Sequence, residues 1–186
     1  MSADELTAGA ERPASAFDAA VYRQVIGSFV SGVVVLTTSA GGQRHGMTVS
    51  AVSSLSLDPP MLLACLHGGS PTQDAVRRSG RFAVNILNED QRQLADRFAG
   101  SGEDKFAGLD VRTGRTGVPL LFGALAVLEC RVVEVVAGGT HRVFLAEVEH
   151  AEAREGSPLA YFRGRFGRFE TTQDDAGYGR TSPWAT

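Results

Sequence analysis

Runs of β-branched and other apolar residues recur along this chain, and only short helical patterns separate them. The densest run, at residues 33–38, places three valines and two threonines in six positions, a composition that favours extended backbone. Further runs lie at 46–57, 61–66 and 82–87, and a long pair of runs at 124–151 predicts a hairpin. These segments do not alternate with helices as βαβ units. We therefore expect a mainly β fold, a closed or partly open antiparallel barrel with a few short peripheral helices, in place of a parallel sheet.

The length of 186 residues suits one domain, which we place at 16–170. Residues 1–15 have the composition of a flexible arm, and residues 171–186 that of a flexible tail. Within the domain there is no internal repeat and no low-complexity segment. The chemistry of the protein is therefore expected to lie on a single folded unit.

Three short helices are predicted, with Ser15, Ser70 and Asn88 as their N-terminal caps. The second has the clearest signals, because proline occupies its first position, glutamine its third, and Gly80 follows its end. Unbonded amides at such a helix start attract anions, and the hydroxyls here add to that attraction. The start of the second helix could therefore hold a phosphate, or the serine could simply cap the helix.

Charge, cysteine and histidine content exclude several classes of function. A net charge of −3 lacks the basic footprint of a nucleic-acid-binding protein, and no stretch predicts a membrane span. Cys65 and Cys130 lie in apolar segments without a CxxC motif, which excludes a disulfide scaffold and a zinc ribbon. The four histidines are too dispersed for a metal pair, and we expect no metal. The opening residues lack the pattern of a signal peptide, so the expected compartment is the reducing cytoplasm.

The run at 46–57 has two chemically different faces if it forms one continuous strand. Thr48, Ser50, Ser54 and Ser56 then point to one side, and apolar side chains point to the other. The hydroxyl face could bind a ligand or could be solvated, as polar strand faces usually are.

An ordered series of segments gives these features a common interpretation. The segments are FVSGVVVLTT, HGMTVSAVSSLSLDPP, SPT, GRFAVNILNEDQ, FAG with DKFAG, LECRVVEV and GGTH. With them, the sequence at 17–170 resembles the flavin reductase component of two-component flavin-dependent monooxygenases. The resemblance implies a split antiparallel β-barrel that binds FMN or FAD, as a homodimer with the flavin near the subunit interface.

The resemblance assigns small, hydroxyl-bearing or cationic side chains and one phenylalanine to the flavin: Thr48, Val49, Ser50, Ser54, Ser56, Ser70, Thr72, Lys105 and Phe82. The first three would lie along the isoalloxazine ring, and the next two along the ribityl chain. Ser70, Thr72 and Lys105 would hold the phosphate through charge-assisted hydrogen bonds. Phe82 would pack near the flavin, or it could be an ordinary core residue.

On the nicotinamide side, the resemblance implies that His141, after the glycine-rich turn, faces NADH or NADPH as the catalytic residue. Thr140 stands where the family often has an acidic residue, so a carboxylate partner for the imidazole is missing here. The segment at 161–169 is predicted as an edge strand, and an aromatic and basic set on it could approach the dinucleotide or be solvated. The members of this set are Tyr161, Arg163, Arg165 and Phe166.

The resemblance therefore implies an NAD(P)H:flavin oxidoreductase that supplies reduced FMN or FAD to a separate flavin-dependent monooxygenase. Hydride transfer between two bound rings needs no strong acid or base from the protein, which agrees with the lack of common hydrolase motifs. One alternative is an FMN-dependent oxidase of the pyridoxamine-phosphate type on the same barrel. Another is a non-catalytic flavin or haem carrier, with His141 or His45 as an axial ligand.

Overall fold

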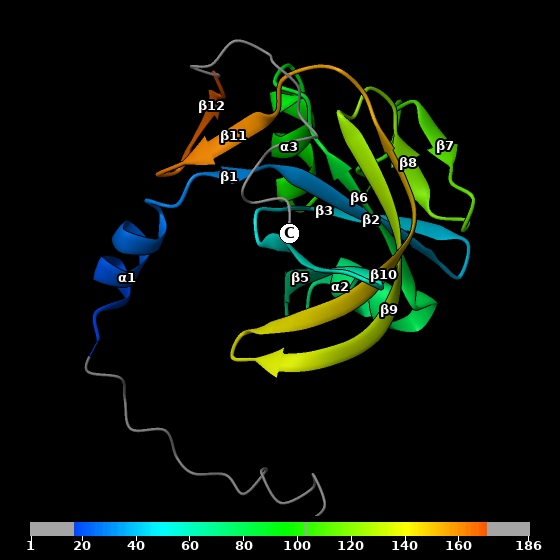
Figure 1. The fold of residues 1–186 in the computed structure, drawn as a ribbon, viewed down its shortest axis with the longest axis horizontal. Helices are drawn as coiled ribbons and strands as arrows, with labels where there is room; N and C mark the ends of the chain where they lie inside the picture. The colour runs from blue at the N-terminus through cyan, green and yellow to red at the C-terminus, as the bar shows by residue number, and fades with distance from the viewer. Residues whose placement is uncertain (1–16, 103, 171–186) are drawn as a thin grey trace, which may run out of the picture.

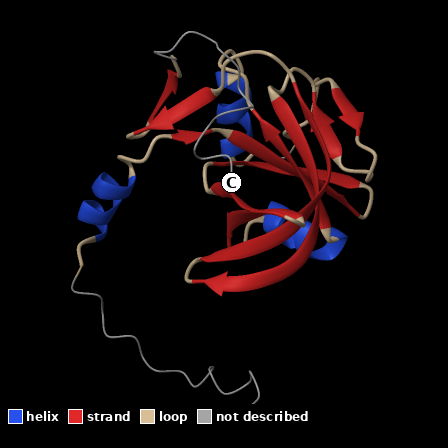
Figure 2. Ribbon diagram, viewed as in Figure 1, coloured by secondary structure: helices blue, strands red, loops and turns tan. Residues whose placement is uncertain are grey.

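A computed structural model describes residues 17–102 and 104–170 of the chain (Figure 1). The arm expected at 1–15, the tail expected at 171–186 and the predicted cap Ser15 lie outside these residues. Strands make up most of the described fold, with three helices around them (Figure 2). The prediction of a mainly β, antiparallel fold with a few short helices is confirmed.

The main sheet has seven strands in the order β3-β2-β6-β9-β10-β5-β4, and every neighbouring pair is antiparallel. The strands are β2 Val34–Ala40, β3 Gln43–Val49, β4 Val52–Leu57, β5 Pro60–His67, β6 Arg81–Ile86, β9 Ala126–Gly138 and β10 His141–Ala153. The predicted long hairpin is the β9–β10 pair, which curves around the molecule in Figure 1. The curvature of the sheet encloses the core.

Two small sheets complete the β structure. β1 (Ser31–Gly32), β11 (Leu159–Phe162) and β12 (Arg165–Arg168) form one, and β7 (Val111–Thr113) with β8 (Pro119–Leu121) forms the other. The prediction of a single edge strand at 161–169 was wrong. Arg163 and Gly164 both have positive φ, 48° and 77°, so the chain reverses there into the β11–β12 hairpin.

The prediction of one continuous strand at 46–57 was also wrong. The chain bends at Ser50 and Ala51, and the two halves become β3 and β4, at opposite edges of the sheet. The Ala51 carbonyl accepts a hydrogen bond from the Cys65 amide at 2.9 Å, which directs the second half onto β5. A register shift between Ser54 and Ser56 then places these serines on opposite faces of β4.

The helices are α1 (Ala19–Ile26), α2 (Pro71–Ser79) and α3 (Arg92–Ala99). Asp18 is the cap of α1, in place of Ser15, and its side chain accepts from the Ala20 amide at 2.7 Å. α2 begins and ends as predicted, with Ser70 as its cap and Gly80 at φ 67°. The prediction that Asn88 caps α3 was wrong, because Gln91 precedes that helix without a capping side-chain bond. No helix in the described part of the chain is long and apolar enough to span a membrane.

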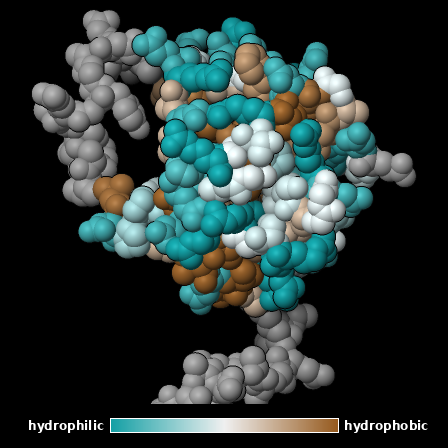
Figure 3. Space-filling view, turned by 90° about the vertical axis from the view of Figure 1, so that its right-hand side faces the viewer, coloured by the Kyte–Doolittle hydropathy of each residue, from teal (hydrophilic) through white to brown (hydrophobic). Residues whose placement is uncertain are grey.

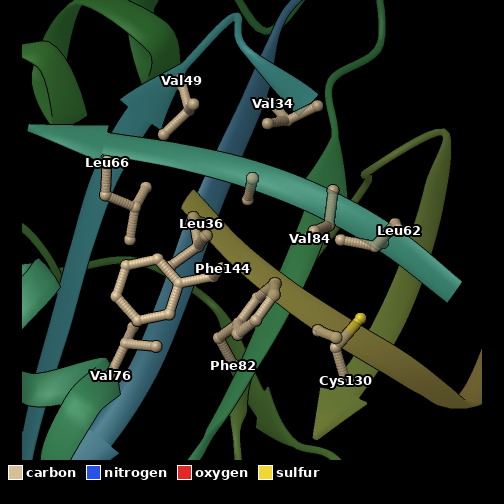
Figure 4. Packing of buried hydrophobic residues seen from close by; sticks show 12 residues of the cluster. Val34, Leu36, Val49, Leu62, Leu66, Val76, Phe82, Val84, Cys130 and Phe144 are labelled. Carbon is tan, nitrogen blue, oxygen red and sulfur yellow. The ribbon is translucent and has the colours of Figure 1, made fainter. Parts of the chain in front are cut away.

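The core has two principal parts, on opposite sides of the β2–β3 region. The larger lies inside the curved sheet, where Leu36, Phe82 and Phe144 are fully buried and Val76 of α2 closes one side (Figure 4). The other part packs beneath α3 around Phe98. On the face seen in Figure 3, hydrophobic colour is confined to patches within a largely hydrophilic surface. α2 and α3 are therefore held on either side of β3, the strand that carries the first predicted site residues.

Candidate functional site

A cavity of about 540 Å³ lies between β3, the start of α2, the end of α3 and the loop that follows α3. It brings together four of the residues that the sequence assigned to the flavin: Thr48, Ser70, Thr72 and Lys105. Arg44, His45 and Asp104 also line it, so the described lining residues include two cations, one imidazole and one acidic side chain. This composition favours an anionic ligand.

The start of α2 contributes fewer free amides than the sequence suggested. Pro71 has no N–H, and the Gln73 amide donates to the Ser70 hydroxyl at 3.2 Å. The Asp74 amide donates to the Ser70 carbonyl at 3.1 Å. The groups left for an anion are the amide and hydroxyl of Thr72 and the positive end of the helix dipole. Ser70 is therefore both a cap and a lining residue of the cavity.

Lys105 supplies a cation beside the end of α3. Its ammonium donates to the carbonyl oxygens of Phe98 at 3.0 Å and Gly46 at 3.4 Å. Partial burial lowers the pKa of Lys105 below its ordinary value, although a lysine starts from a value so high that it stays charged near neutral pH. Since an ammonium has three donors, one remains for a ligand.

The two faces of β3 have different roles from those that the sequence suggested. The Thr48 hydroxyl donates to the Ala95 carbonyl of α3 at 2.6 Å, so it ties the strand to the helix. A Cβ on Gly46 would lie 2.6 Å from the Phe98 ring, which shows how closely α3 approaches the strand. Val49 points into the core and is only 6% exposed. The fixed spacing of β3 and α3 therefore sets the width of the cavity.

The remaining flavin residues of the prediction are dispersed. Phe82 is fully buried among core residues, so the structure supports its alternative role and offers a ligand no surface of its ring. Ser50 lies exposed at the bend between β3 and β4. Ser54 and Ser56 lie on β4, at the other edge of the sheet, with only Ser56 partly buried. The expected single hydroxyl face does not exist within one chain.

His141 begins β10 and lies opposite His67, the last residue of β5. The ring centroids are 5.4 Å apart in an edge-to-face arrangement. The Thr140 hydroxyl lies 2.9 Å from His141 Nδ1, so this threonine provides the partner that an acidic residue would otherwise provide. His67 was missed in the sequence because its position beside His141 depends on the register of β5 against β10.

The histidine pair is connected to the start of α2 through a short loop. The Gly68 amide donates to the Thr140 carbonyl at 2.9 Å, and the Ser70 amide donates to the His67 carbonyl at 3.3 Å. The loop at 67–70 therefore joins the His141 end of the sheet to the anion cavity. The two parts of the predicted site, separated by 70 residues in sequence, are neighbours along this edge of the molecule.

The aromatic and basic set near the chain end forms a separate surface. The Tyr161 and Phe166 rings lie 5.4 Å apart, and both rings pack on the core beneath α3. The Arg163 guanidinium stacks 5.1 Å from the Phe162 ring and donates to the Ser28 hydroxyl. Arg163, Arg165 and Phe166 border a hollow of about 650 Å³ that shares no lining residue with the anion cavity. Within one chain, this set does not meet the anion cavity.

No group of three or more metal-ligating side chains occurs among residues 17–102 and 104–170. The cavity thus offers hydroxyls, amides and cations as its binding groups.

Comparison with known proteins gives one consistent relationship. A family model described as "Flavin reductase like domain" matches residues 26–170. The chain is 50% identical over 152 residues to the reductase component of a 4-nitrophenol 4-monooxygenase/4-nitrocatechol 2-monooxygenase from Rhodococcus opacus, with 82% of each chain covered. It is 37% identical to a flavin-dependent monooxygenase reductase subunit, HsaB, from Rhodococcus jostii, over 87% of this chain and 84% of that one.

Solved structures show the same relationship. The NADH:FAD oxidoreductase SgcE6 of Streptomyces globisporus, in complex with NAD and FAD fragments, superposes with a TM-score of 0.80 at 34% identity, covering 84% of this chain and 96% of that one. Nitrilotriacetate monooxygenase component B from Mycobacterium thermoresistibile gives a TM-score of 0.81 at 36% identity, covering 87% and 92%.

Proposed function

Because this chain belongs to the family of flavin reductase-like domains, we propose that its anion cavity and the adjacent His141 are the binding sites through which it reduces flavin. The chain is an NAD(P)H-dependent flavin reductase with the split β-barrel fold, and it supplies reduced flavin to a separate monooxygenase. The oxidase and haem-carrier alternatives are therefore set aside. The observation that carries the proposal is the convergence of Ser70, Thr72 and Lys105 on one cavity.

The cavity has the groups that a flavin phosphate requires. The Thr72 amide and hydroxyl and the free donor of Lys105 can each donate to a phosphate oxygen, and the α2 dipole adds to the attraction. Ser70 shapes the helix start by accepting from the Gln73 amide. Ser50, exposed at the bend between β3 and β4, is proposed to meet the flavin ring through its backbone and hydroxyl.

Flavin and nicotinamide, when bound, supply the hydride donor and acceptor, and the protein has to align and shield them. His141 is proposed to orient the nicotinamide, with the Thr140 hydroxyl fixing its ring through Nδ1. Ser54, Ser56 and the surface around Arg163 and Arg165 lie away from the cavity in one chain. They could reach a flavin or dinucleotide only where two chains meet.

We propose a homodimer as the working form. α1 has eight residues, and none of them is buried in the described chain. Val21 and Val25 are 45% and 62% exposed, and Phe29, just beyond the helix, is 74% exposed. So short a helix is rarely stable without a packing partner. A second copy that covers α1 would provide one, and this face borders the β1–β11–β12 sheet that carries Arg163 (Figure 1).

The cytoplasm is the proposed compartment. Cys65 and Cys130 are both free thiols, as expected for a reducing environment. Burial raises the pKa of the Cys130 thiol to about 12, with smaller contributions from Glu149 and Glu129. This thiol is therefore protonated near neutral pH.

NADH is the proposed hydride donor, since a relative 37% identical in sequence is named as an NADH-dependent FMN reductase and a protein of the same fold is named as an NADH:FAD oxidoreductase. Either FMN or FAD fits a site that recognises the phosphate next to the ribityl chain. Steady-state oxidation of NADH and of NADPH, each with FMN and with FAD, tests the assignment. Turnover with NADH should follow flavin concentration, and the lack of any flavin-dependent oxidation would contradict the proposed function.

A further inference from the structure

His45 is a half-buried histidine that lines the anion cavity, and the flavin assignments do not include it. Its Nε2 atom is buried and has no hydrogen-bond partner within residues 17–102 and 104–170. A buried polar nitrogen without a partner is costly in a folded protein. The imidazole therefore has an unused hydrogen-bonding group at a site already equipped for anions.

The position of His45 on β3 places it beside the start of α2. His45 and Met47 are two residues apart on the strand, so they share a face about 7 Å apart along it. The Ser70 hydroxyl contacts the Met47 sulfur at 3.6 Å on this same face. Thr38, opposite His45 on β2, is bonded to Ser79 and to the Arg81 carbonyl. The Thr38 hydroxyl is therefore engaged with these groups and not with His45.

We propose that His45 is a further phosphate-binding residue: its ring, whose Nε2 is enclosed in the free protein, turns toward the cavity, donates from Nε2 to the flavin phosphate and is protonated when the phosphate binds. The proposal rests on the proposed function, because it assumes that the cavity holds a phosphate monoester. It makes FMN binding in this protein proton-coupled: one proton is taken from solvent by the imidazole for each FMN bound. The phosphate remains a dianion, and no covalent bond changes.

The charges around His45 determine the direction of this coupling. Arg44 and Lys105 line the same cavity, Asp104 is the acidic lining residue, and Arg78 approaches from α2. Burial, and secondarily Arg78, lowers the pKa of His45 below its ordinary value, so the free protein holds a neutral imidazole near pH 7. A phosphate carries close to two negative charges at neutral pH and favours the imidazolium. Binding therefore raises the pKa of His45, and affinity for the phosphate decreases as pH rises.

The test is the affinity of the whole protein for FMN and for riboflavin between about pH 6.5 and 8.5, a range in which the FMN phosphate is largely a dianion. FMN affinity of the wild type should decrease with rising pH, by up to about tenfold per unit. Riboflavin affinity should not change. His45→Gln keeps a neutral donor but cannot be protonated, so its FMN affinity should be several-fold weaker at the low end of the range and independent of pH.

His150→Gln is the matched control, because His150 is also half-buried but lies on β10 outside the cavity. It should keep the pH dependence of the wild type. If His45→Gln keeps that dependence too, or if riboflavin shows it equally, the role of His45 is refuted while the phosphate site stands. If FMN and riboflavin bind with equal affinity at every pH, the phosphate site itself is refuted.

A measurement on the wild type alone guards against a variant that fails to fold. The enthalpy of FMN binding at about pH 7.5, measured in buffers with different ionisation enthalpies, gives the number of protons taken up. Uptake with FMN and with inorganic phosphate, but not with riboflavin, supports the proposal. Zero uptake with FMN contradicts it.

Discussion

Single side chains of the site are held in place mostly by bonds to the backbone. Lys105 donates to two carbonyls, Thr48 to a third, and the His141 imidazole is fixed through the Thr140 hydroxyl. Bonds of this kind restrict the rotamers of the groups that meet a ligand, so less conformational entropy is lost on binding. This preorganisation suits an enzyme whose task is to align two rings.

His141→Ala tests the orienting role on the nicotinamide side. It should raise the KM for NADH and lower kcat/KM by about 2- to 12-fold, the worth of one hydrogen bond of ~0.5–1.5 kcal/mol. Flavin affinity should hardly change, because His141 is not part of the anion cavity. Thr140→Val keeps the imidazole but removes its partner at Nδ1, and should cause a smaller loss of the same kind. A large loss of flavin affinity in His141→Ala would contradict the assignment.

Glu129 gives a prediction about stability and pH. It is 3% exposed and accepts from the Arg115 amide and from the amide and hydroxyl of Thr116. Burial alone would raise the pKa of Glu129, but these hydrogen bonds, aided by His150, hold it below its ordinary value of 4.5. Since the folded pKa is the lower one, this stabilisation is present above the unfolded value and is lost as pH falls through the folded value.

Glu129→Gln should therefore reduce the free energy of unfolding by about 1.5–3 kcal/mol at pH 7, the range for hydrogen bonds to a charged group. Urea unfolding at pH 7 and below about pH 4 measures the difference, which should shrink at the acidic pH. Glu152→Gln is the control, since this exposed carboxylate pairs only with Arg112 among the described residues. A deficit of the same size at both pH values would refute the role of the charge.

How far single residues could be predicted depended on whether their role is local. Ser70 was identified as a cap because capping involves residues within one helical turn. Other roles depend on which distant elements meet each face of a strand. These are the hydrogen bond from Thr48 to α3, the burial of Val49 and Phe82, and the pairing of His67 with His141. No local pattern contains that information.

Among the elements, the contact of β3 with α3 has the greatest effect on the site. Gly46 permits it, since a Cβ would lie 2.6 Å from the Phe98 ring and 3.2 Å from that of Phe106. Both rings lie at the cavity wall and in the core beneath α3. A side chain at this position would separate the two walls of the cavity.

Gly46→Val should lower the free energy of unfolding by about 1–3 kcal/mol through overpacking and should also weaken FMN binding. Thermal unfolding and FMN titration measure the two effects. Gly32→Ala is the control, because a Cβ there meets nothing within 4 Å among the described residues and the glycine lacks a positive φ. If Gly46→Val matches that control in both measurements, the close approach of α3 to β3 does not determine the width of the cavity.

At the element scale, the sequence predicted most of the strands and the cap of α2. The Asn88 cap was wrong, and α1 is capped by Asp18 and not by Ser15. The valine-rich and long hairpin segments are strands because their composition allows little else. The break at Ser50 and Ala51 and the β11–β12 reversal were missed. The break arises because β3 pairs with β2 and β4 pairs with β5. The reversal places a non-glycine residue, Arg163, at positive φ, which the sequence does not signal.

For the whole molecule, the exposed apolar residues of α1 predict the dimer. Val25→Asp should shift the protein toward a monomer, because it places a charge within the proposed interface. Phe122→Asp is the control, since Phe122 is 64% exposed but lies beside β8, away from α1. Light scattering during size-exclusion chromatography measures the mass of each. A monomeric wild type, or a dimer unaffected by Val25→Asp, would show that α1 does not form the interface.

The central claim is that the cavity between β3, α2 and α3 holds the flavin phosphate, and Lys105→Ala tests it most directly. FMN binding should weaken by about 1.5–3 kcal/mol, or roughly 12- to 160-fold, while riboflavin binding stays nearly unchanged. Lys105→Met, which keeps a long unbranched side chain but removes the charge and the donor to the Phe98 carbonyl, should behave in the same way. Equal weakening of FMN and riboflavin, or no weakening of FMN, would contradict the account.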